Sequence, residues 1–342
     1  MGLVMVVALT SGPTAAHQAL ASPQQDIGTV RAQVTDLEMR AAGANEDYKQ
    51  ALAQLRQTRQ LQSSLRTRLG RERSRLATLE ETADALARAA YMAGGLPPSL
   101  HLLLAGDSRE LLSQAGRLDA VARVQAASIR RAQTARAAVA QRTAALADQG
   151  RIAGRILEQM RASKQTIDSR LAQARSLLAS LQPVQRKQLA AEANGRARQS
   201  QAQAGRLAQA LASPAARPRG VSSRAMAAVK YALSHVGSPY SLNAHPPTSW
   251  DCSKLTAAAW ARGGVGLTSL SYAQWNQVQR IPSSQLRPGD LVFYFRGDAH
   301  HVALYVGNGK MVSASNPSDG VEVIDYLGPW YAEHYSGAGR VL

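Results

Sequence analysis

The last third of the chain contains the two residue types that a thiol hydrolase needs. The 342-residue sequence has one cysteine, Cys252, which lies between Asp251 and Ser253 where the pattern predicts the first turn of a helix. The positive end of a helix lowers the pKa of a thiol and so favours the nucleophilic thiolate. Further along, His300 and His301 offer an imidazole that could accept the thiol proton. The alternative for a lone cysteine is an inert, buried side chain that packs as a small apolar residue.

Strand periodicity separates the two histidines. Residues 300–315 are predicted to form a β-hairpin with Asn308-Gly309 at its turn. Neighbouring residues of a strand point to opposite faces, so His301 shares its face with Ala303. The small side chain of Ala303 leaves room beside a ring that must meet another group. This favours His301 over His300 as the base.

The elements around these residues predict an α+β domain. A helix is expected after Ser222-Ser223 and a second one near Cys252, capped by Thr248 or Ser249. Strands are expected within 286–295, 300–315, 320–326 and 338–342. Because helices come first and an antiparallel sheet follows, the class is α+β rather than α/β.

The region upstream reads as a long coiled coil. From about Asp26 to Ser213, apolar residues recur at steps of three, four and seven within Ala, Arg and Gln, as at Leu69, Leu76, Leu79 and Leu86. Gly94-Gly95 and Pro97-Pro98 interrupt it, leaving arms over 26–92 and 108–181 of roughly 100 and 110 Å. Near-equal arms joined by a compact tip predict an antiparallel hairpin, with a third helix over 184–212 near its base. A parallel homodimer is the alternative.

Amino-acid composition indicates the boundaries between the N-terminal segment, the coiled coil and the globular domain. Residues 1–21 resemble a signal peptide, although no Lys or Arg precedes Arg31. We therefore expect a leader at 1–21, a coiled-coil hairpin at 22–211, a Pro/Gly-containing linker at 212–223 and a globular domain at 224–342. No other stretch has the roughly 18 apolar residues of a membrane span, so the mature chain is not expected to cross a bilayer.

Charge follows the same division. Residues 224–342 hold nine Lys/Arg and seven Asp/Glu, a net of +2, so +15 of the total +17 lies upstream. Excess Arg on a helix is usually a solvated surface, and in an exported protein it also favours anionic lipids or wall polymers. Aromatic residues are not interleaved with this charge, so nucleic acid is not expected as a partner.

Four motifs in order, "PY", "DCS", "LRPGDLVFY" and "HVALYVGNG", span residues 239–309. Together they resemble the NlpC-type cell-wall endopeptidases, a papain-like superfamily, and the resemblance covers about residues 224–342. The Ala/Arg-rich hairpin with its "GGLPPSLHLLLAGDSRELL" tip resembles the N-terminal coiled coils of exported actinobacterial members. The resemblance therefore implies a helical hairpin followed by a papain-like domain of helices packed on an antiparallel sheet.

The resemblance also implies roles for individual residues. Cys252 matches the nucleophile and His301 the general base, while Tyr240, Asp251 and Ser253 match positions that hold the amine and peptide of the substrate. No metal or cofactor is implied. This sequence departs from the family at Lys254, where glycine is usual, and at residues 241–244, which lack the usual aromatic and paired glycines.

A third polar group should orient the base. The family position lies twelve residues after His301 and is here Ser313. A three-residue hairpin loop, Gly307 to Gly309, places Ser313 opposite Ala303 on the face of His301. A two-residue loop instead places Asn316 opposite His301. The resemblance favours Ser313, with Asn316 as the alternative.

The resulting functional hypothesis is an exported or envelope-associated peptidoglycan hydrolase. By resemblance it cleaves stem peptides, at the γ-D-glutamyl–diamino acid bond, by a Cys/His thiolate mechanism. The coiled coil is expected to restrain or recruit it, with a membrane-bound protein of the division machinery as partner. The alternatives are a catalytically inactive adaptor that only binds wall peptides, and an amidase that uses the same chemistry at the sugar–peptide junction.

Overall fold

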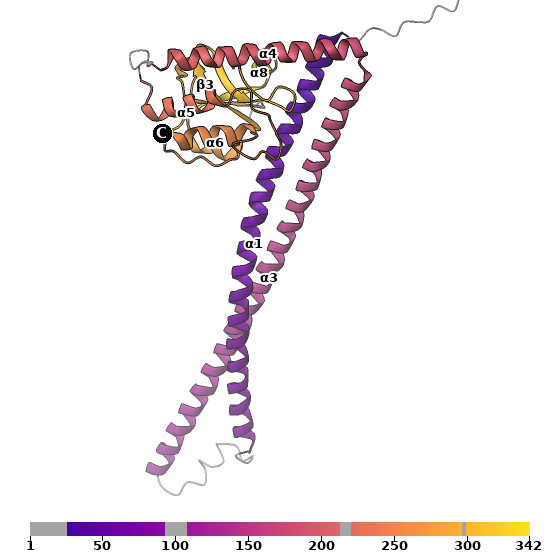
Figure 1. The fold of residues 1–342 in the computed structure, drawn as a ribbon. Helices are drawn as coiled ribbons and strands as arrows, with labels where there is room; N and C mark the ends of the chain where they lie inside the picture. The colour runs from indigo at the N-terminus through magenta and orange to yellow at the C-terminus, as the bar shows by residue number, and fades with distance from the viewer. Residues whose placement is uncertain (1–25, 93–107, 213–219, 296–298) are drawn as a thin grey trace, which may run out of the picture.

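The computed structural model describes residues 26–92, 108–212, 220–295 and 299–342. Helices α1 (Ile27–Met92) and α3 (Ser108–Ser180) pack along each other as a long hairpin (Figure 1). The antiparallel hairpin predicted from the apolar spacing is thereby confirmed. Its Gly/Pro tip lies outside the described residues, as do the expected leader and most of the linker. No helix within the described ranges is both long and apolar enough to span a bilayer.

The hairpin has a thin apolar seam. Near its base Val30 and Val34 of α1 pack against Ala174 of α3 and against Leu181 just beyond it, and all four are buried. Most other positions of both helices face solvent. A seam of this width follows from apolar residues at heptad spacing separated by Arg, Gln and Glu. The hairpin is therefore held by one stripe rather than by a broad core.

Helix α4 (Pro183–Ala210) turns back from the base of the hairpin and lies along the globular domain (Figure 1). It begins directly after Gln182, whose side chain forms a reciprocal cap with Gln185. Ala204 of α4 is buried in the core of the globular domain. The Ser200 hydroxyl accepts a hydrogen bond of 2.7 Å from the backbone N–H of Val323. Since Val323 lies on an outer strand, α4 covers a sheet edge that would otherwise be open.

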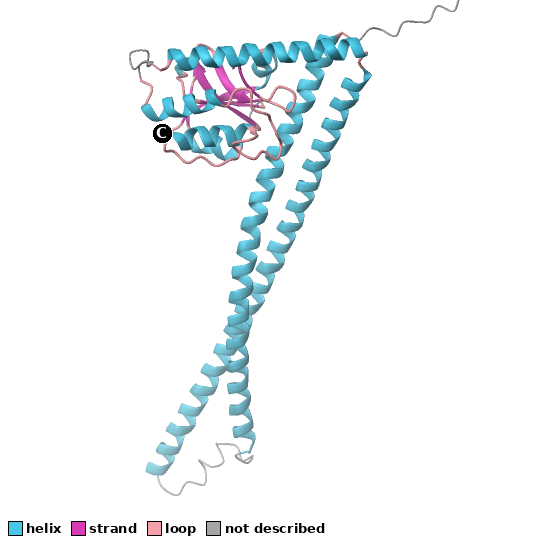
Figure 2. Ribbon diagram, in the orientation of Figure 1, coloured by secondary structure: helices cyan, strands magenta, loops and turns pink. Residues whose placement is uncertain are grey.

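In the described part of the chain, six antiparallel strands form one sheet in the order β1-β6-β2-β3-β4-β5 (Figure 2). Their bounds are β1 Gln279–Ile281, β2 Leu291–Tyr294, β3 His301–Gly307, β4 Lys310–Ala314, β5 Val321–Asp325 and β6 Tyr335–Arg340. Each predicted strand is present, and β1 was not predicted. It is a three-residue strand paired at the edge with β6, too short to show alternation.

Helices cover the sheet on one face and aromatic residues on the other. The remaining helices are α5 Ser223–Ser234, α6 Cys252–Arg262, α7 Ser271–Gln277, the 3₁₀ turn η2 Ser283–Gln285 and α8 Pro329–His334. α5 and α6 bury their apolar sides against Phe293, Val302 and Leu304. The opposite face packs Tyr294 and Ala303 against aromatic residues that include those of α8. This is the α+β class that the order of elements predicts.

The hairpin of β3 and β4 has the register that brings Ser313 to the face of His301. Leu304 pairs with Val312 and Tyr305 with Met311, and a bulge follows before Gly307 pairs with Lys310. The pairs beyond the bulge have the register of the three-residue loop, whereas the turn itself closes between Gly307 and Lys310 as a two-residue loop does.

Gly289 offers a test of how tightly α5 packs against the turn before β2. Its φ is +102°, and an added Cβ would lie 2.6 Å from the Cβ of Ala225. We expect Gly289→Ala to lower the free energy of unfolding by about 3 kcal/mol, through backbone strain and overlap together. Gly264→Ala is the matched control, because φ is +77° and no atom lies within 4 Å of the new Cβ. It should cost only about 1 kcal/mol of strain. Equal losses in denaturant unfolding would contradict the close packing.

Candidate active site

Helix α6 holds the thiol at its first position, and Asp251 caps it. The Asp251 carboxylate accepts a 2.8 Å hydrogen bond from the backbone N–H of Lys254. The prediction that Thr248 or Ser249 caps this helix is therefore wrong. Both hydroxyls instead stabilise the preceding loop at His245. Aspartate serves as a cap because its carboxylate also interacts favourably with the positive end of the helix.

The thiol and the imidazole are both buried. Cys252 is 1% exposed and His301 is 0% exposed. The sulfur lies within hydrogen-bonding reach of the backbone N–H of Val302, the residue directly after His301. His301 Nδ1 has no hydrogen-bond partner among the described residues. The structure thus brings nucleophile and base to the same place, at the start of α6 and the start of β3.

Ser313 lies beside the other ring nitrogen. Its Oγ is 2.9 Å from His301 Nε2, and the serine is fully buried. Asn316 is engaged elsewhere, because its Oδ1 accepts hydrogen bonds from the backbone N–H groups of Ser318 and Asp319. Of the two candidates, Ser313 is the one placed to hold the ring.

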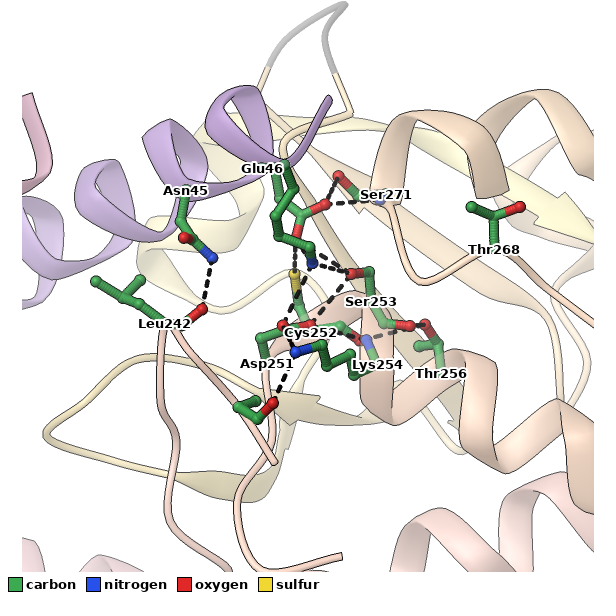
Figure 3. A network of polar contacts seen from close by, with 12 residues as sticks. Asn45, Glu46, Leu242, Asp251, Cys252, Ser253, Lys254, Thr256, Thr268 and Ser271 are labelled. Carbon is green, nitrogen blue, oxygen red and sulfur yellow. Dashed lines mark hydrogen bonds and ion pairs between the residues drawn. The ribbon is translucent and has the colours of Figure 1, made fainter. Parts of the chain in front are cut away.

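A residue from the hairpin occupies the site. Glu46 of α1 reaches into the cleft, where its Oε1 lies 3.8 Å from Cys252 Sγ and 3.1 Å from Ser253 Oγ (Figure 3). Its other oxygen, Oε2, accepts 2.8 and 3.0 Å hydrogen bonds from the backbone N–H and hydroxyl of Ser271. Glu46 is only 1% exposed. The carboxylate therefore covers the thiol and bridges α6 to α7.

Lys49, three residues further along α1, neutralises this charge. Its Nζ lies 2.6 Å from Glu46 Oε1, 3.3 Å from Asp251 Oδ2 and 2.8 Å from Ser253 Oγ. Burial alone would lower the pKa of Lys49, but the carboxylates of Glu46 and Asp251 outweigh it and raise the pKa. The ammonium is thus held charged between Asp251 and Ser253, two of the residues predicted to bind substrate.

Tyr240 completes the predicted set. Its backbone forms an isolated bridge with Trp250, the residue before Asp251. Burial, followed by the nearby charges of Cys252 and Asp251, raises the pKa of its phenol well above the ordinary value. The phenol therefore stays neutral beside the thiol.

Lys254, the departure from the family pattern, points away from the thiol. Its Nζ donates a 2.6 Å hydrogen bond to the carbonyl of Ala244 and lies 3.8 Å from Asp251 Oδ2. The lysine thus closes the loop over 241–244, the second departure, onto the start of α6.

Burial holds both reactive groups in their neutral forms. Desolvation, then the charges of Glu46 and Asp251, raise the pKa of the Cys252 thiol well above its ordinary value, while Lys49 opposes this. Desolvation lowers the pKa of His301 to about 3. With α1 in place, the thiol remains protonated and the imidazole uncharged at neutral pH.

The cleft also contains a possible set of metal ligands. One ligand atom each from Glu46, Asp251 and Cys252 lies within 4.8 Å of the others. The Lys49 ammonium forms ion pairs with both carboxylates of this set. The negative charge that would attract a cation is therefore already countered from within the chain.

Further contacts hold α1 against the domain on the N-terminal side of Glu46. Asn45 donates to the carbonyl of Leu242 at 3.0 Å, and Glu38 accepts from the Ser318 hydroxyl at 2.8 Å. Gly43 lies directly against the domain, because a Cβ there would be 3.1 Å from the ring of Phe295 and 3.3 Å from His300. Residues 41–44 are all small and buried. They let the helix approach closely enough for Glu46 to reach the thiol.

The sequence reasoning did not identify Glu46, Lys49 or Ser271. For α1 a signal was present, since "AAGANEDYK" over 41–49 replaces the spaced seam with consecutive small residues and contains no Arg. A run of this kind on a coiled coil indicates a second packing partner. Ser271 has no comparable signal, because one serine before a seven-residue helix is a common pattern.

Comparison with known proteins places the globular domain in a family. A model of the NlpC/P60 family matches residues 237–340. The "Probable endopeptidase p60" of Listeria monocytogenes is 40% identical over 111 residues, which are 32% of this chain and 22% of that protein. A "Probable endopeptidase" of Mycobacterium tuberculosis is 35% identical over 120 residues, which are 34% of this chain and 31% of that protein.

These matches concern only part of each protein, so this chain spans less than a third of the length of both relatives. Among solved structures, the P60 domain of an antigen from Mycobacterium avium subspecies paratuberculosis is 30% identical. That alignment covers 34% of this chain and 94% of that one, with a TM-score of 0.31. Residues 237–340 are therefore an NlpC/P60 domain.

Proposed function

We propose that this chain is an exported peptidoglycan endopeptidase that cleaves stem peptides through Cys252 and His301 and is held inactive by α1. The observation that carries this proposal is the occupancy of the cleft by Glu46 and Lys49. Their contacts define an ammonium position and a carboxylate position beside the thiol. The printed names of the relatives, probable endopeptidases, support the reaction class.

The two positions match the chemistry of a stem peptide. Asp251 and Ser253 hold an ammonium, which in a substrate would be the free amine of the stem. Ser271 holds a carboxylate through its N–H and hydroxyl, which in a substrate would be the free carboxylate of a γ-linked glutamate. A γ-linked glutamate leaves its α-carboxylate free, two methylene groups from the amide carbonyl, so we propose the γ-D-glutamyl–diamino acid bond as the one cleaved.

The proposed reaction uses the side chains of Cys252 and His301, the backbone N–H of Cys252 and a water molecule. His301 Nδ1 accepts the Cys252 proton, and the thiolate attacks the amide carbonyl to form a tetrahedral adduct. The oxyanion is stabilised by the backbone N–H of Cys252 at the positive end of α6. The imidazolium returns the proton to the leaving amine, which leaves a thioester. Water, deprotonated by His301, hydrolyses that thioester and restores the thiol.

In this proposal α1 acts as an intramolecular inhibitor. Glu46 blocks the thiol, Lys49 fills the amine position, and burial keeps both reactive groups neutral. A partner that draws the hairpin away would open the cleft, and we propose a membrane-bound envelope protein for that role. Localisation at the cell envelope follows from the substrate.

The first prediction concerns the nucleophile. We expect Cys252→Ser to abolish hydrolysis while preserving the fold, because the two side chains are nearly isosteric but the hydroxyl is a far weaker nucleophile. The background for both proteins is Glu46→Ala/Lys49→Ala, which empties the cleft. Muropeptides would be analysed by mass spectrometry after digestion, which also identifies the bond. Products from the serine variant equal to those of its parent would exclude the proposed mechanism.

The second prediction concerns the inhibitor. A leucine at position 43 overlaps Phe295 and His300, so Gly43→Leu should lift α1 and raise both hydrolysis and alkylation of Cys252 at least about tenfold. Gly70→Leu is the matched control, since it lies on the same helix and a Cβ there meets nothing within 4 Å. Both variants gain the same helix propensity. If the two behaved alike, α1 would not be the inhibitor.

The third prediction concerns pH. Glu46 raises the pKa of the Cys252 thiol, so removing its charge in Glu46→Gln should shift the pH midpoint of alkylation downward. Cys252 is the only cysteine, so iodoacetamide incorporation by the full chain reports this thiol alone. Glu72→Gln, whose partner is Arg142 of α3, is the control and should leave the midpoint unchanged. An unchanged or higher midpoint in Glu46→Gln would contradict the electrostatic role.

A further inference from the structure

Ser313 orients the base without supplying charge. A hydroxyl accepts a hydrogen bond from the ring but cannot stabilise an imidazolium as a carboxylate does. Behind Ser313, on the side away from the thiol, lies a second set of polar side chains. It consists of Ser315 on the same face at the end of β4, Tyr331 of α8 and Glu322 of β5.

These groups form a continuous chain of contacts. The Tyr331 hydroxyl donates a 3.0 Å hydrogen bond to Ser315 Oγ. The hydroxyls of Ser313 and Ser315 both lower the pKa of Tyr331, and Ser315 also lowers the pKa of Glu322, against the rise that burial causes in each. Ser313 and Glu322 are paired across β4 and β5, so their side chains project from the same face of the sheet. The ring of Tyr331 also lies 6.0 Å from that of His301, centroid to centroid.

The ionised carboxylate sets the direction of every bond in this chain, because it can only accept. Ser315 therefore donates its proton to Glu322 and accepts from Tyr331. Tyr331, having donated, accepts from Ser313, and Ser313 in turn accepts from His301. The proton of the neutral ring must then reside on Nε2. This leaves Nδ1, the nitrogen without a partner among the described residues, as the basic one.

We propose that Glu322 is a positioning residue that acts on His301 through Ser315, Tyr331 and Ser313. This chain of hydrogen bonds, here called the relay, fixes the Nε2–H tautomer of His301. At its far end Glu322 supplies the negative charge that the Ser313 hydroxyl lacks. The catalytic role of His301 rests on the proposed function, but its tautomer can be measured without any substrate.

The surroundings of Glu322 determine the pH at which this carboxylate is ionised. It lines a cavity of about 1210 Å³ between α1, α4 and β5, together with Arg196 and Asp319. Burial, followed by the charge of Asp319, raises the pKa of Glu322 to about 7, while Arg196 opposes this. Measurements at pH 8.5, well above that pKa, examine the carboxylate in its ionised form.

The tautomer is tested by ¹⁵N NMR of the full chain labelled at histidine, with His301 assigned through His301→Gln. We expect the unmodified chain to show a protonated Nε2 and an unprotonated Nδ1. In Tyr331→Phe, Ser313 loses the acceptor for its own proton and can donate to the ring, so the two tautomers should mix. Glu322→Gln should mix them as well, because an amide can donate to Ser315 as well as accept from it.

Turnover of a synthetic stem peptide is measured in the Glu46→Ala/Lys49→Ala background. We expect Tyr331→Phe to lower kcat about tenfold and Glu322→Gln about threefold, each with KM within about twofold, since neither contacts substrate. Asp325→Asn is the control. It lies on the same strand, but its carboxylate is largely exposed and paired with Lys310. It should change neither kcat nor the tautomer.

The outcomes separate the relay from the proposed function. A single Nε2–H tautomer that is lost in both variants supports the relay even if no stem peptide is cleaved, in which case only the proposed function fails. An unmodified chain protonated at Nδ1 would overturn the relay, whatever the turnover. The relay would also be overturned if Tyr331→Phe and Glu322→Gln both left the His301 tautomer and kcat unchanged.

Discussion

The arrangement depends on one buried carboxylate. Glu46 contacts the thiol of α6 with one oxygen and the N–H of α7 with the other, and it is stabilised by Lys49 from its own helix. A buried charge is tolerated only where it is paired and hydrogen-bonded, and Glu46 satisfies both conditions inside the cleft. The contacts that satisfy Glu46 are with residues predicted to bind substrate or adjacent to them. The hairpin and the domain are therefore joined through the chemistry of the site itself.

The two helices that contact the domain do so by different means. α4 buries Ala204 in the core and packs Leu207 and Leu211 against it. α1 adds only the small residue Ala42 to that core and otherwise makes mainly polar contacts, through Glu38, Asn45 and Glu46. Water can replace much of a polar contact at small net cost, whereas exposing apolar surface is costly in proportion to its area. Of the two attachments, α1 is therefore the one that we propose detaches while the domain stays folded.

Much of the fold and of the candidate site could be predicted from the sequence, because these features depend on the periodicity and the motifs of short segments. Cys252 at a helix start, the two arms of the hairpin and the alternation after His301 all depend on residues close together in the chain. The placement of Glu46 does not depend on nearby residues. Glu46 lies about two hundred residues from Cys252, and packing against α3 already accounts for the apolar pattern of its helix. The choice between Ser313 and Asn316 depended on hairpin register, where Asn308-Gly309 permits two loop lengths. The Asp251 cap was missed because Thr248 and Ser249 are equally good capping residues in isolation.

The same burial acts on the two reactive groups in opposite directions. Desolvation penalises whichever form is charged, so it raises the pKa of the thiol and lowers that of the imidazole. Both shifts stabilise the neutral pair and oppose the thiolate–imidazolium pair. If α1 withdraws as proposed, solvent reaches both groups and the repulsion from Glu46 is removed in the same movement. The positive end of α6 and the contact of His301 with Ser313 remain, because neither involves α1. A single displacement would thus uncover the thiol, empty the ammonium position and reverse both pKa shifts, without any rearrangement within the domain.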